Sequence, residues 1–329
     1  MRTIRVVAPS RSLGTISEKN VLLATEKLTH LGFIVEFGKN ASQKDEFYSS
    51  SIEERIEDLH ESFTDNSVDI VLSALGGSNS NQLLDYIDYD LIERNHKVIC
   101  GFSDIVALLN AIYAKTSVVT YCGPNFHSFA MKQGLDSTID SFEAVVSGQE
   151  YQLVDPEYYS DDKWYDNQDN RVFKKNTGMI VVNEGEASGI IVGGNLCTFN
   201  LLQGTAYMPD LNGKVLFLED DDMSGDAYAF EFDRNIQSII HQQGFKNVKG
   251  IVIGRSQSNT NMDYCKWEKI IKSKPTLEHI PIVINANFGH TTPMATIPIG
   301  GECTIIACGA NIEIKYRAEP LVKTFNQKV

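Results

Sequence analysis

The amino-acid sequence predicts an α/β protein in two parts: an N-terminal α/β domain built on a parallel sheet, and a β-rich C-terminal domain. Apolar strand-like runs alternate with helix-like runs through the first half of the chain, as they do when helices cover both faces of a parallel sheet. After residue 176 the strand-like runs predominate. A chain of 329 residues is long enough to form two domains.

The first half supplies the alternating elements. The apolar run at 4–8 predicts the first strand, and residues 17–31 predict an amphipathic helix that Gly32 terminates. The pattern over 51–64 predicts a second helix. The side chains expected to face inward from these two helices are Val21, Leu22, Leu28, Leu31, Ile52, Ile56, Leu59 and Phe63. Further strands are expected at 33–37, 68–75, 98–100 and 118–121.

The segment at 155–176 differs from both halves in its amino-acid composition and in the spacing of its apolar residues. It is polar and aromatic without a clear period, which indicates an interdomain or substrate-facing loop. We therefore predict a domain at 1–154, this loop at 155–176, and a second domain at 177–329. The second domain is expected to contain one long helix, at about 226–243. Its strands are expected at 178–182, 188–192, 214–218, 250–253, 280–285, 304–307 and 311–316.

Charge and apolar content exclude several classes of function. The chain has 43 acidic and 29 basic residues, which gives a formal net charge of −14. Binding to nucleic acid without sequence preference needs clustered Lys and Arg, so we expect no nucleic-acid partner. Charge interrupts the N-terminus too soon for a signal peptide, and no apolar run approaches the length of a membrane span. These features predict a cytoplasmic protein that does not bind membranes.

The cysteines agree with that location. All six occur singly, and none has C-x-x-C spacing. Such cysteines are expected to be reduced core residues rather than a disulfide framework or a zinc site. They are Cys100, Cys122, Cys197, Cys265, Cys303 and Cys308.

The most informative turn carries Ser103, between the apolar strand at 98–100 and a largely buried helix that begins near Asp104. A serine at a strand-to-helix turn is held rigidly with its hydroxyl pointing outward. The backbone N–H of Asp104 opens the helix and can face an oxyanion. This geometry suits a nucleophile. Serine is also a favoured helix N-cap, and the turn alone favours that simpler interpretation.

An activated serine needs a base to accept its proton and an acid to orient the base. Five of the seven histidines lie on helices or at helix ends among polar neighbours, where a solvated side chain is expected. His127 and His290 lie in loops after strands, and His290, among small and turn-forming residues, is the better candidate. Glu219 ends the apolar strand at 214–218, where it is either functional or the first solvated residue of a loop.

Two other motifs bear on chemistry. Gly76 and Gly77 follow the strand at 68–75, but no G-K-[ST] follows them, so they do not form a phosphate-binding P-loop. Gly77 is either a second oxyanion donor or part of a tight turn. The acids at 220–222 do not predict a metal site, because three consecutive side chains cannot all face one ion and no second ligand cluster is present.

In combination, these motifs resemble the LD-carboxypeptidase family of serine peptidases. The motifs that carry the resemblance, over essentially the whole chain, lie at 76–77, 101–105, 193–196, 202–205, 217–220, 289–293 and 297–300. The resemblance implies a triad of Ser103 as nucleophile, Glu219 as orienting acid and His290 as general base. It implies a flavodoxin- or amidotransferase-like α/β domain with the serine, and a β-rich domain with the acid and base. The active site would lie between them, usually in a homodimer, with no metal or cofactor.

Within the family, the chain resembles the branch of microcin C immunity peptidases, through its motifs at 78–84, 120–124 and 161–165. This implies an aminoacyl- or peptidyl-nucleotide substrate and a role in immunity or detoxification. It also implies that an aromatic side chain of the 155–176 loop stacks on the nucleobase: Trp164, with Tyr159 and Tyr165 as alternatives. Asn195 matches the position that holds the acyl part. A Trp164 that merely packs the loop down, and a muropeptide substrate that loses its terminal D-alanine, are the alternatives.

Overall fold

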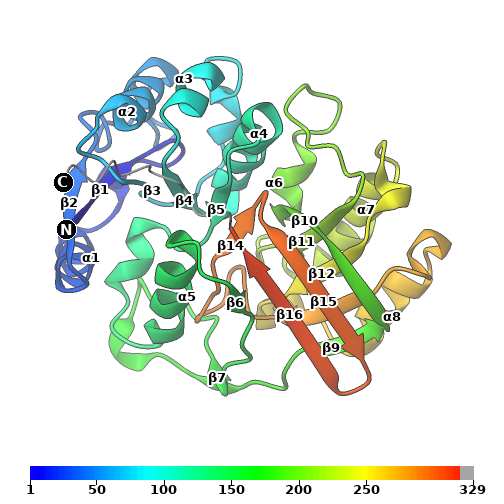
Figure 1. Ribbon diagram of the computed structural model, residues 1–329. Coiled ribbons are helices and arrows are strands. Elements are labelled where there is room, and N and C mark those ends of the chain that lie inside the picture. The colour runs from blue at the N-terminus through cyan, green and yellow to red at the C-terminus, as the bar shows by residue number, and fades with distance from the viewer. Residues whose placement is uncertain (319–329) are drawn as a thin grey trace, which may run out of the picture.

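The computed structural model describes residues 1–318. The last part of the predicted domain at 177–329, residues 319–329, lies outside the described residues. Two main sheets lie side by side, each with helices packed against it (Figure 1). The predicted fold class is confirmed: the N-terminal part is an α/β unit on a parallel sheet, and the C-terminal part is rich in strands.

The first sheet has the strand order β14-β5-β4-β3-β1-β2, and its five N-terminal strands are parallel. Every residue of β3 and β4 is buried, as expected for strands covered on both faces. The strands are β1 (Arg2–Val7), β2 (Phe33–Phe37), β3 (Ile70–Ser73), β4 (Val98–Gly101), β5 (Thr120–Cys122) and β14 (Ile297–Ile299). The helices of this part are α1 (Glu18–His30), α2 (Ile52–Thr64), α3 (Tyr89–Arg94), α4 (Val106–Thr116) and α5 (Asp136–Val146).

The predicted helices α1 and α2 are present, with one error in their inward faces. In α2, Leu59 and Phe63 are fully buried, and Ser51 and Glu54 form a capping box at its N-terminus. In α1, Leu28 is buried, but Leu22 is 62% exposed, so its prediction as an inward residue was wrong. The buried side of α1 runs through Ala24 and Leu28, and Leu22, two residues before Ala24, lies on nearly the opposite face of the helix.

The second sheet has the order β6-β16-β15-β10-β11-β12-β13-β9, and the four strands from β10 to β13 are parallel. Its strands are β6 (Tyr151–Gln152), β9 (Ile180–Asn183), β10 (Gly185–Asn195), β11 (Lys214–Glu219), β12 (Gly250–Gly254), β13 (Ile282–Ala286), β15 (Glu302–Cys308) and β16 (Asn311–Arg317). The helices are α6 (Leu196–Asn200), α7 (Tyr228–Ile240) and α8 (Tyr264–Lys272). Only one long helix was predicted here, and α8, whose buried residues are Trp267, Ile270 and Ile271, was not. A third, two-stranded sheet pairs β7 (Tyr158–Tyr159) with β8 (Lys174–Lys175).

Each main sheet takes one strand from the other part of the chain. The short β6 pairs with β16 of the second sheet, and β14 pairs antiparallel with β5 of the first. Pro298 in β14 occupies the sheet edge, where its missing N–H costs least. The consequence for function lies in the connection. Because β13 belongs to the second sheet and β14 to the first, the loop between them crosses from one sheet to the other, and this loop carries His290.

The six cysteines are free. Cys100, Cys122 and Cys303 are buried as predicted, but Cys197, Cys265 and Cys308 are exposed, which corrects the expectation that all six are core residues. Cys265 and Cys308 lie near buried residues on amphipathic elements. The apolar residues around them in the sequence therefore did not indicate that the two cysteines are exposed. Across residues 1–318, the structure contains no helix that is both long and apolar enough to span a membrane.

Candidate active site

Ser103 lies just beyond the carboxyl end of β4, with a backbone φ of 63°. A left-handed conformation is uncommon for residues other than glycine and marks a turn that the surrounding structure enforces. Gly101 permits the close packing beneath it, because a Cβ there would lie 2.8 Å from the Cβ of Ser73. Within the described part of the chain, the Ser103 hydroxyl makes no helix-capping hydrogen bond, and its side-chain partner is His290. The N-cap interpretation of Ser103 therefore has no support in the structure.

The structure brings Ser103, His290 and Glu219 into one hydrogen-bonded chain. The Oγ of Ser103 lies 3.1 Å from Nε2 of His290, and Nδ1 of His290 lies 2.7 Å from Oε2 of Glu219. Glu219 ends β11 and is 2% exposed. With a neutral imidazole, Nδ1–H donates to the carboxylate and Nε2 accepts the hydroxyl proton of Ser103. This is the arrangement that a nucleophile, a base and an orienting acid require.

Glycines make room for Glu219 on two sides. A Cβ at Gly254 would lie 2.8 Å from the Cβ of Glu219, and a Cβ at Gly289 would lie 2.6 Å from its Oε2. Gly289 also has a φ of +97°, which other residues rarely adopt. The residue that precedes His290 is therefore restricted to glycine by both conformation and space.

A close contact between the two sheets positions these three residues. The side chain of Asn110, in α4, donates to the carbonyl of Gly193 at 2.8 Å and accepts from the N–H of Gly193 at 3.1 Å. Next along β10, a Cβ at Gly194 would lie 2.6 Å from Val106 of α4. β10 pairs in parallel with β11, with Asn195 opposite Glu219. The helix that follows Ser103 thus packs directly on the strand beside the one that ends at Glu219.

The charges around His290 favour its protonated form. Burial alone lowers the pKa of His290, but the charge and hydrogen bond of Glu219, with the charges of Asp221 and Asp220, outweigh it and raise the pKa to about 9. Asp220 is perturbed as well. Burial, with the negative charges of Glu219 and Asp221, raises the pKa of Asp220 to about 7. Coupled, perturbed groups of this kind are typical of functional sites.

Gly76 lies directly beside Ser103, and Gly77 follows it. A Cβ at Gly76 would lie 2.8 Å from the Cβ of Ser103, whereas a Cβ at Gly77 would lie 2.2 Å from the Oγ of Ser10. Within residues 1–318, the backbone N–H groups of Gly77 and Asp104, the two predicted oxyanion donors, have no hydrogen-bond partner. Both groups therefore remain available to a ligand.

The side chain of Asp104 has a role that the sequence analysis missed. Its Oδ2 accepts hydrogen bonds from Ser10 Oγ and from the backbone N–H groups of Asn79 and Ser80, at 2.5, 2.9 and 2.9 Å. These bonds fix the loop after β3 against the turn that carries Ser103. The only sequence signal was an acid directly after the serine, which equally suits the first turn of a helix.

Asn195, predicted to hold the acyl part of a substrate, is buried and already makes two side-chain contacts. Its Oδ1 caps α6 by accepting from the N–H of Thr198 at 3.0 Å, and its Nδ2 donates to Asp220 at 3.1 Å. One N–H of its amide group remains for another partner. Asn195 therefore orients Asp220 beside Glu219.

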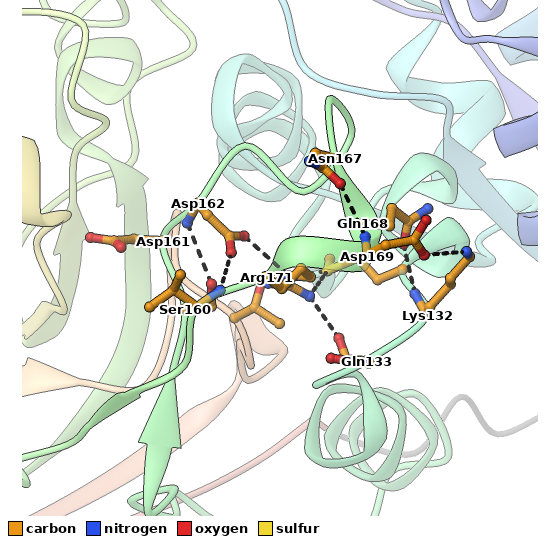
Figure 2. Close-up of polar contacts among 12 residues, drawn as sticks. Lys132, Gln133, Ser160, Asp161, Asp162, Asn167, Gln168, Asp169 and Arg171 are labelled. Carbon is orange, nitrogen blue, oxygen red and sulfur yellow. Dashed lines mark hydrogen bonds and ion pairs between the residues drawn. The ribbon is translucent and has the colours of Figure 1, made fainter.

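The loop at 155–176 is fixed at several points, as Figure 2 shows. The guanidinium of Arg171 donates to Asp162 at 3.1 Å and to the carbonyl of Gln133 at 2.7 Å. Lys132 forms an ion pair with Asp169 at 2.8 Å. These contacts attach the loop to the segment before α5.

Ser160 joins this loop to the His290 loop through a two-way backbone bridge to Thr292, and the aromatic side chains of the loop pack against different partners. The Trp164 ring lies 4.7 Å from the ring of His127, centroid to centroid, and Tyr165 packs on Trp164. The N–H of His127 bonds the carbonyl of Ala74, two residues before Gly76, so Trp164 lies near the glycine turn. Burial lowers the pKa of His127 to about 4, and the structure gives His127 no contact with Ser103.

Tyr159 points elsewhere. The guanidinium of Arg255, which is 3% exposed, lies 4.8 Å from the centre of the Tyr159 ring. Arg255 donates to the side chains of Asn287 and Thr291, on either side of His290. Arg255 was not predicted as a site residue, although a cation directly after an apolar strand was a readable signal. A cavity of about 490 Å³ beside Arg255 and Tyr159 contains none of the triad candidates.

In the described part of the chain, no three or more His, Cys, Asp or Glu residues are placed to bind a metal ion together. The acids at 220–222 point to different partners: Asp220 bonds Asn195, and Asp222 bonds Asn259.

Comparison with known families agrees with the fold. A family model for the LD-carboxypeptidase N-terminal domain matches residues 4–123, and one for the LD-carboxypeptidase C-terminal domain matches residues 188–305. The chain therefore belongs to the LD-carboxypeptidase family, as the resemblance predicted, and is a hydrolase of the carboxypeptidase class. The putative carboxypeptidase YocD of Bacillus subtilis is 46% identical over 94% of this chain and 95% of that protein.

Other relatives represent both branches considered above. The microcin C7 self-immunity protein MccF of Escherichia coli is 31% identical over 93% of this chain and 91% of its own length. The crystal structure of an MccF-like protein from Bacillus anthracis is 51% identical, with a TM-score of 0.94 over 95% of this chain and 96% of that one. Structures of MccF in complex with glutamyl sulfamoyl guanosine and with aspartyl sulfamoyl adenosine are 28% identical, with TM-scores of 0.84 and 0.85 and 97% of each chain covered. A probable murein peptide carboxypeptidase of Bacillus subtilis is 26% identical over 92% of this chain and 88% of its own length.

Proposed function

We propose that this protein is a serine hydrolase that cleaves aminoacyl- or peptidyl-nucleotides of the microcin C type through an acyl-enzyme. The observation that carries the proposal is the chain of contacts from Ser103 to His290 at 3.1 Å and from His290 to Glu219 at 2.7 Å. Its substrate class rests on the similarity to MccF, which has been crystallised with aminoacyl sulfamoyl nucleosides.

In the first half-reaction, Nε2 of His290 accepts the hydroxyl proton while Oγ of Ser103 attacks the scissile carbonyl carbon. Glu219 holds the imidazole in the required tautomer and stabilises the imidazolium. The tetrahedral oxyanion accepts hydrogen bonds from the N–H groups of Gly77 and Asp104, and each such donor contributes about 3 kcal/mol to lowering the barrier. His290 then returns the proton to the leaving nitrogen, and the C–N bond breaks.

The second half-reaction regenerates the enzyme. Water gives a proton to His290 and attacks the acyl carbon, and Ser103 leaves with that proton as the free acid of the acyl group forms. Trp164 stacks on the nucleobase, and Asn195 contacts the acyl part. We further propose that the enzyme acts in the cytoplasm as a homodimer, in immunity or detoxification.

The test is a substrate competition with purified protein. Aminoacyl sulfamoyl adenosine and an L,D-linked muropeptide tetrapeptide are supplied, and release of sulfamoyl adenosine is measured against release of D-alanine. We expect nucleoside release, with an acyl adduct on Ser103 in rapid-quench mass spectrometry. Release of D-alanine alone would replace this substrate class with the muropeptide.

Two variants separate the mechanism from the fold. Ser103→Ala is expected to abolish turnover while leaving the circular dichroism spectrum unchanged, and exposed Ser67→Ala is the matched control with full activity. A Ser103→Ala protein with wild-type turnover refutes the triad. Trp164→Leu is expected to raise KM for the nucleoside substrate selectively, compared with Tyr165→Leu.

A further inference from the structure

The two glycines after β3 separate Ser103 from a second chemical group, Arg11. A Cβ at Gly76 would face Ser103 at 2.8 Å, whereas a Cβ at Gly77 would lie 2.9 Å from the backbone nitrogen of Arg11 and 3.2 Å from its Cβ. The N–H of Arg11 also donates to the carbonyl of Gly76 at 3.2 Å. Ser103 and Arg11 therefore flank the same glycine pair from opposite sides.

The Arg11 side chain is exposed and, among residues 1–318, no carboxylate lies within ion-pair distance of it. Its guanidinium instead lies 5.9 Å from the centre of the Tyr48 ring. Tyr48 is 58% exposed and has a φ of 63°, a conformation that a bulky residue adopts only where its neighbours impose it. A free cation on an exposed aromatic platform is suited to hold an anion.

The Tyr48 platform is attached to the glycine loop. The carbonyl of Tyr48 accepts from the N–H of Ser12 at 2.8 Å, and Ser49 exchanges hydrogen bonds with the side chain of Asn79. Asn79 in turn donates through its backbone to Asp104, the residue after Ser103. Arg11 and Tyr48 therefore belong to the same fixed framework as the proposed oxyanion donors.

Three acids act on His290, and the other arginines near the site are buried. Glu219, Asp220 and Asp221 surround His290, and the whole chain carries a net charge of −14. Arg55, another cation near this loop, is buried and donates to Pro9, Asn79 and Gln82, so it cannot reach a ligand. Arg11 is therefore an exposed cation that an anionic leaving group beside the glycine pair can reach.

We propose that Arg11, supported by Tyr48, binds the negatively charged group attached to the leaving nitrogen of the substrate. The proposal rests on the proposed function, in which the scissile carbonyl lies between Ser103 and the N–H of Gly77. The next group along the leaving side then lies over the glycine pair, within reach of Arg11. In an acyl nucleotide joined through nitrogen to phosphorus this anion is the phosphoryl group, and in a muropeptide it is the D-alanine carboxylate.

Equilibrium binding tests Arg11 without turnover. By calorimetry, the wild type is expected to bind adenosine monophosphate more tightly than adenosine, and Arg11→Gln is expected to lose about tenfold to 100-fold in affinity for the monophosphate only. Arg11→Lys is expected to retain part of the preference for the monophosphate. Arg94 is an exposed arginine at the end of α3, before the amino end of β4, and Arg94→Gln is expected to leave the preference unchanged. The affinities for D-alanine and for the neutral D-alaninamide are measured in the same way. If Arg11→Gln weakens the binding of D-alanine but not that of adenosine monophosphate, the anion that Arg11 binds is a carboxylate.

The outcomes separate this proposal from the proposed function. Equal losses for adenosine monophosphate and adenosine in Arg11→Gln would show a structural role and overturn the Arg11 site. The Arg11 site would also be overturned if the wild type bound adenosine monophosphate no more tightly than adenosine, and D-alanine no more tightly than D-alaninamide. If Arg11 governs anion binding while the wild type releases no nucleoside from aminoacyl sulfamoyl adenosine, the site stands and the proposed substrate fails.

Discussion

The hydroxyl of Ser10, in the loop after β1, donates a 2.5 Å hydrogen bond to the carboxylate of Asp104, in the turn between β4 and α4. The same carboxylate oxygen accepts the backbone N–H groups of Asn79 and Ser80. One side-chain oxygen thus joins the loops that follow β1 and β3 to the residue that follows Ser103. It positions both proposed oxyanion donors.

Asp104→Asn keeps the size of the side chain and removes its charge. Hydrogen bonds to an ionised acceptor are worth about 2 kcal/mol each, and weakening them loosens the loop that carries Gly77. We expect kcat to fall about tenfold to 100-fold with a smaller change in KM. Asp65→Asn is the matched control, because Asp65 also accepts several hydrogen bonds but precedes the amino end of β3, away from Ser103 at the carboxyl end of β4. Equal effects of the two variants on kcat would contradict a positioning role for Asp104.

The raised pKa of His290 predicts the pH dependence of activity. The base must be neutral to accept a proton, and a pKa of about 9 leaves a small neutral fraction at pH 7. In the free enzyme, kcat/KM is therefore expected to rise about tenfold per pH unit up to pH 9. Asp220→Asn removes one charge that raises this pKa, so the rise is expected to move to lower pH. Asp222→Asn, which alters a neighbouring acid with a different partner, is expected to leave the profile in place. A profile that is the same in all three proteins would exclude Asp220 as a determinant.

The same pKa shift has a signature in stability. His290 has a higher pKa in the folded protein than its ordinary value of 6.5, so its protonated form stabilises the fold. This contribution is fully present below pH 6.5 and is lost as the pH rises through about 9. The difference in free energy of unfolding between the wild type and His290→Gln is therefore expected to shrink over that interval, as measured by urea denaturation. A difference that grows with pH would contradict the assigned shift.

Ser103 offers a test of backbone strain that does not involve activity. Ser103→Ala and Ser103→Gly both remove the hydroxyl, but only glycine adopts a φ of 63° without steric cost. The glycine variant is expected to be more stable than the alanine variant by about 1 kcal/mol in urea denaturation. The control is the same pair of substitutions at Thr25, within α1. There the glycine variant is expected to be less stable than the alanine variant, because glycine is about 1 kcal/mol less favourable than alanine in a helix. If alanine is the more stable substituent at both positions, the turn at Ser103 is not strained.

What the sequence could predict depended on the range of the interaction. The turn at Ser103 and the strand end at Glu219 are local patterns, and the family motifs linked them to His290. The shape of the loop that carries His290 was not predictable, because it depends on β14 pairing with β5, about 175 residues earlier in the chain. No strand was predicted at Pro298, and only an edge position accommodates a proline in this sheet. Arg255 and the carboxylate of Asp104 were missed for a similar reason, since their partners lie on other elements.

The buried guanidinium of Arg171 predicts how firmly the 155–176 loop is held. Its side chain is fully buried, donates to Asp162 and Gln133, and packs on Phe173 with 4.9 Å between the guanidinium carbon and the ring centre. Arg171→Met leaves these acceptors without their donor, at a cost of about 1–3 kcal/mol for a buried group. Hydrogen exchange of the loop amides is therefore expected to accelerate about tenfold or more. KM for the nucleoside substrate is expected to rise with it, because the same loop carries Trp164.

Lys132→Met supplies the comparison for Arg171 within the same set of contacts (Figure 2). Lys132 and Asp169 are 40% and 78% exposed, and exposed ion pairs contribute at most about 1 kcal/mol. Its loss is therefore expected to change loop exchange and KM little. If both variants accelerate exchange equally, burial does not decide which contact holds the loop. If Arg171→Met accelerates exchange without raising KM, the loop can open freely without weakening substrate binding, and the stacking role proposed for Trp164 is wrong.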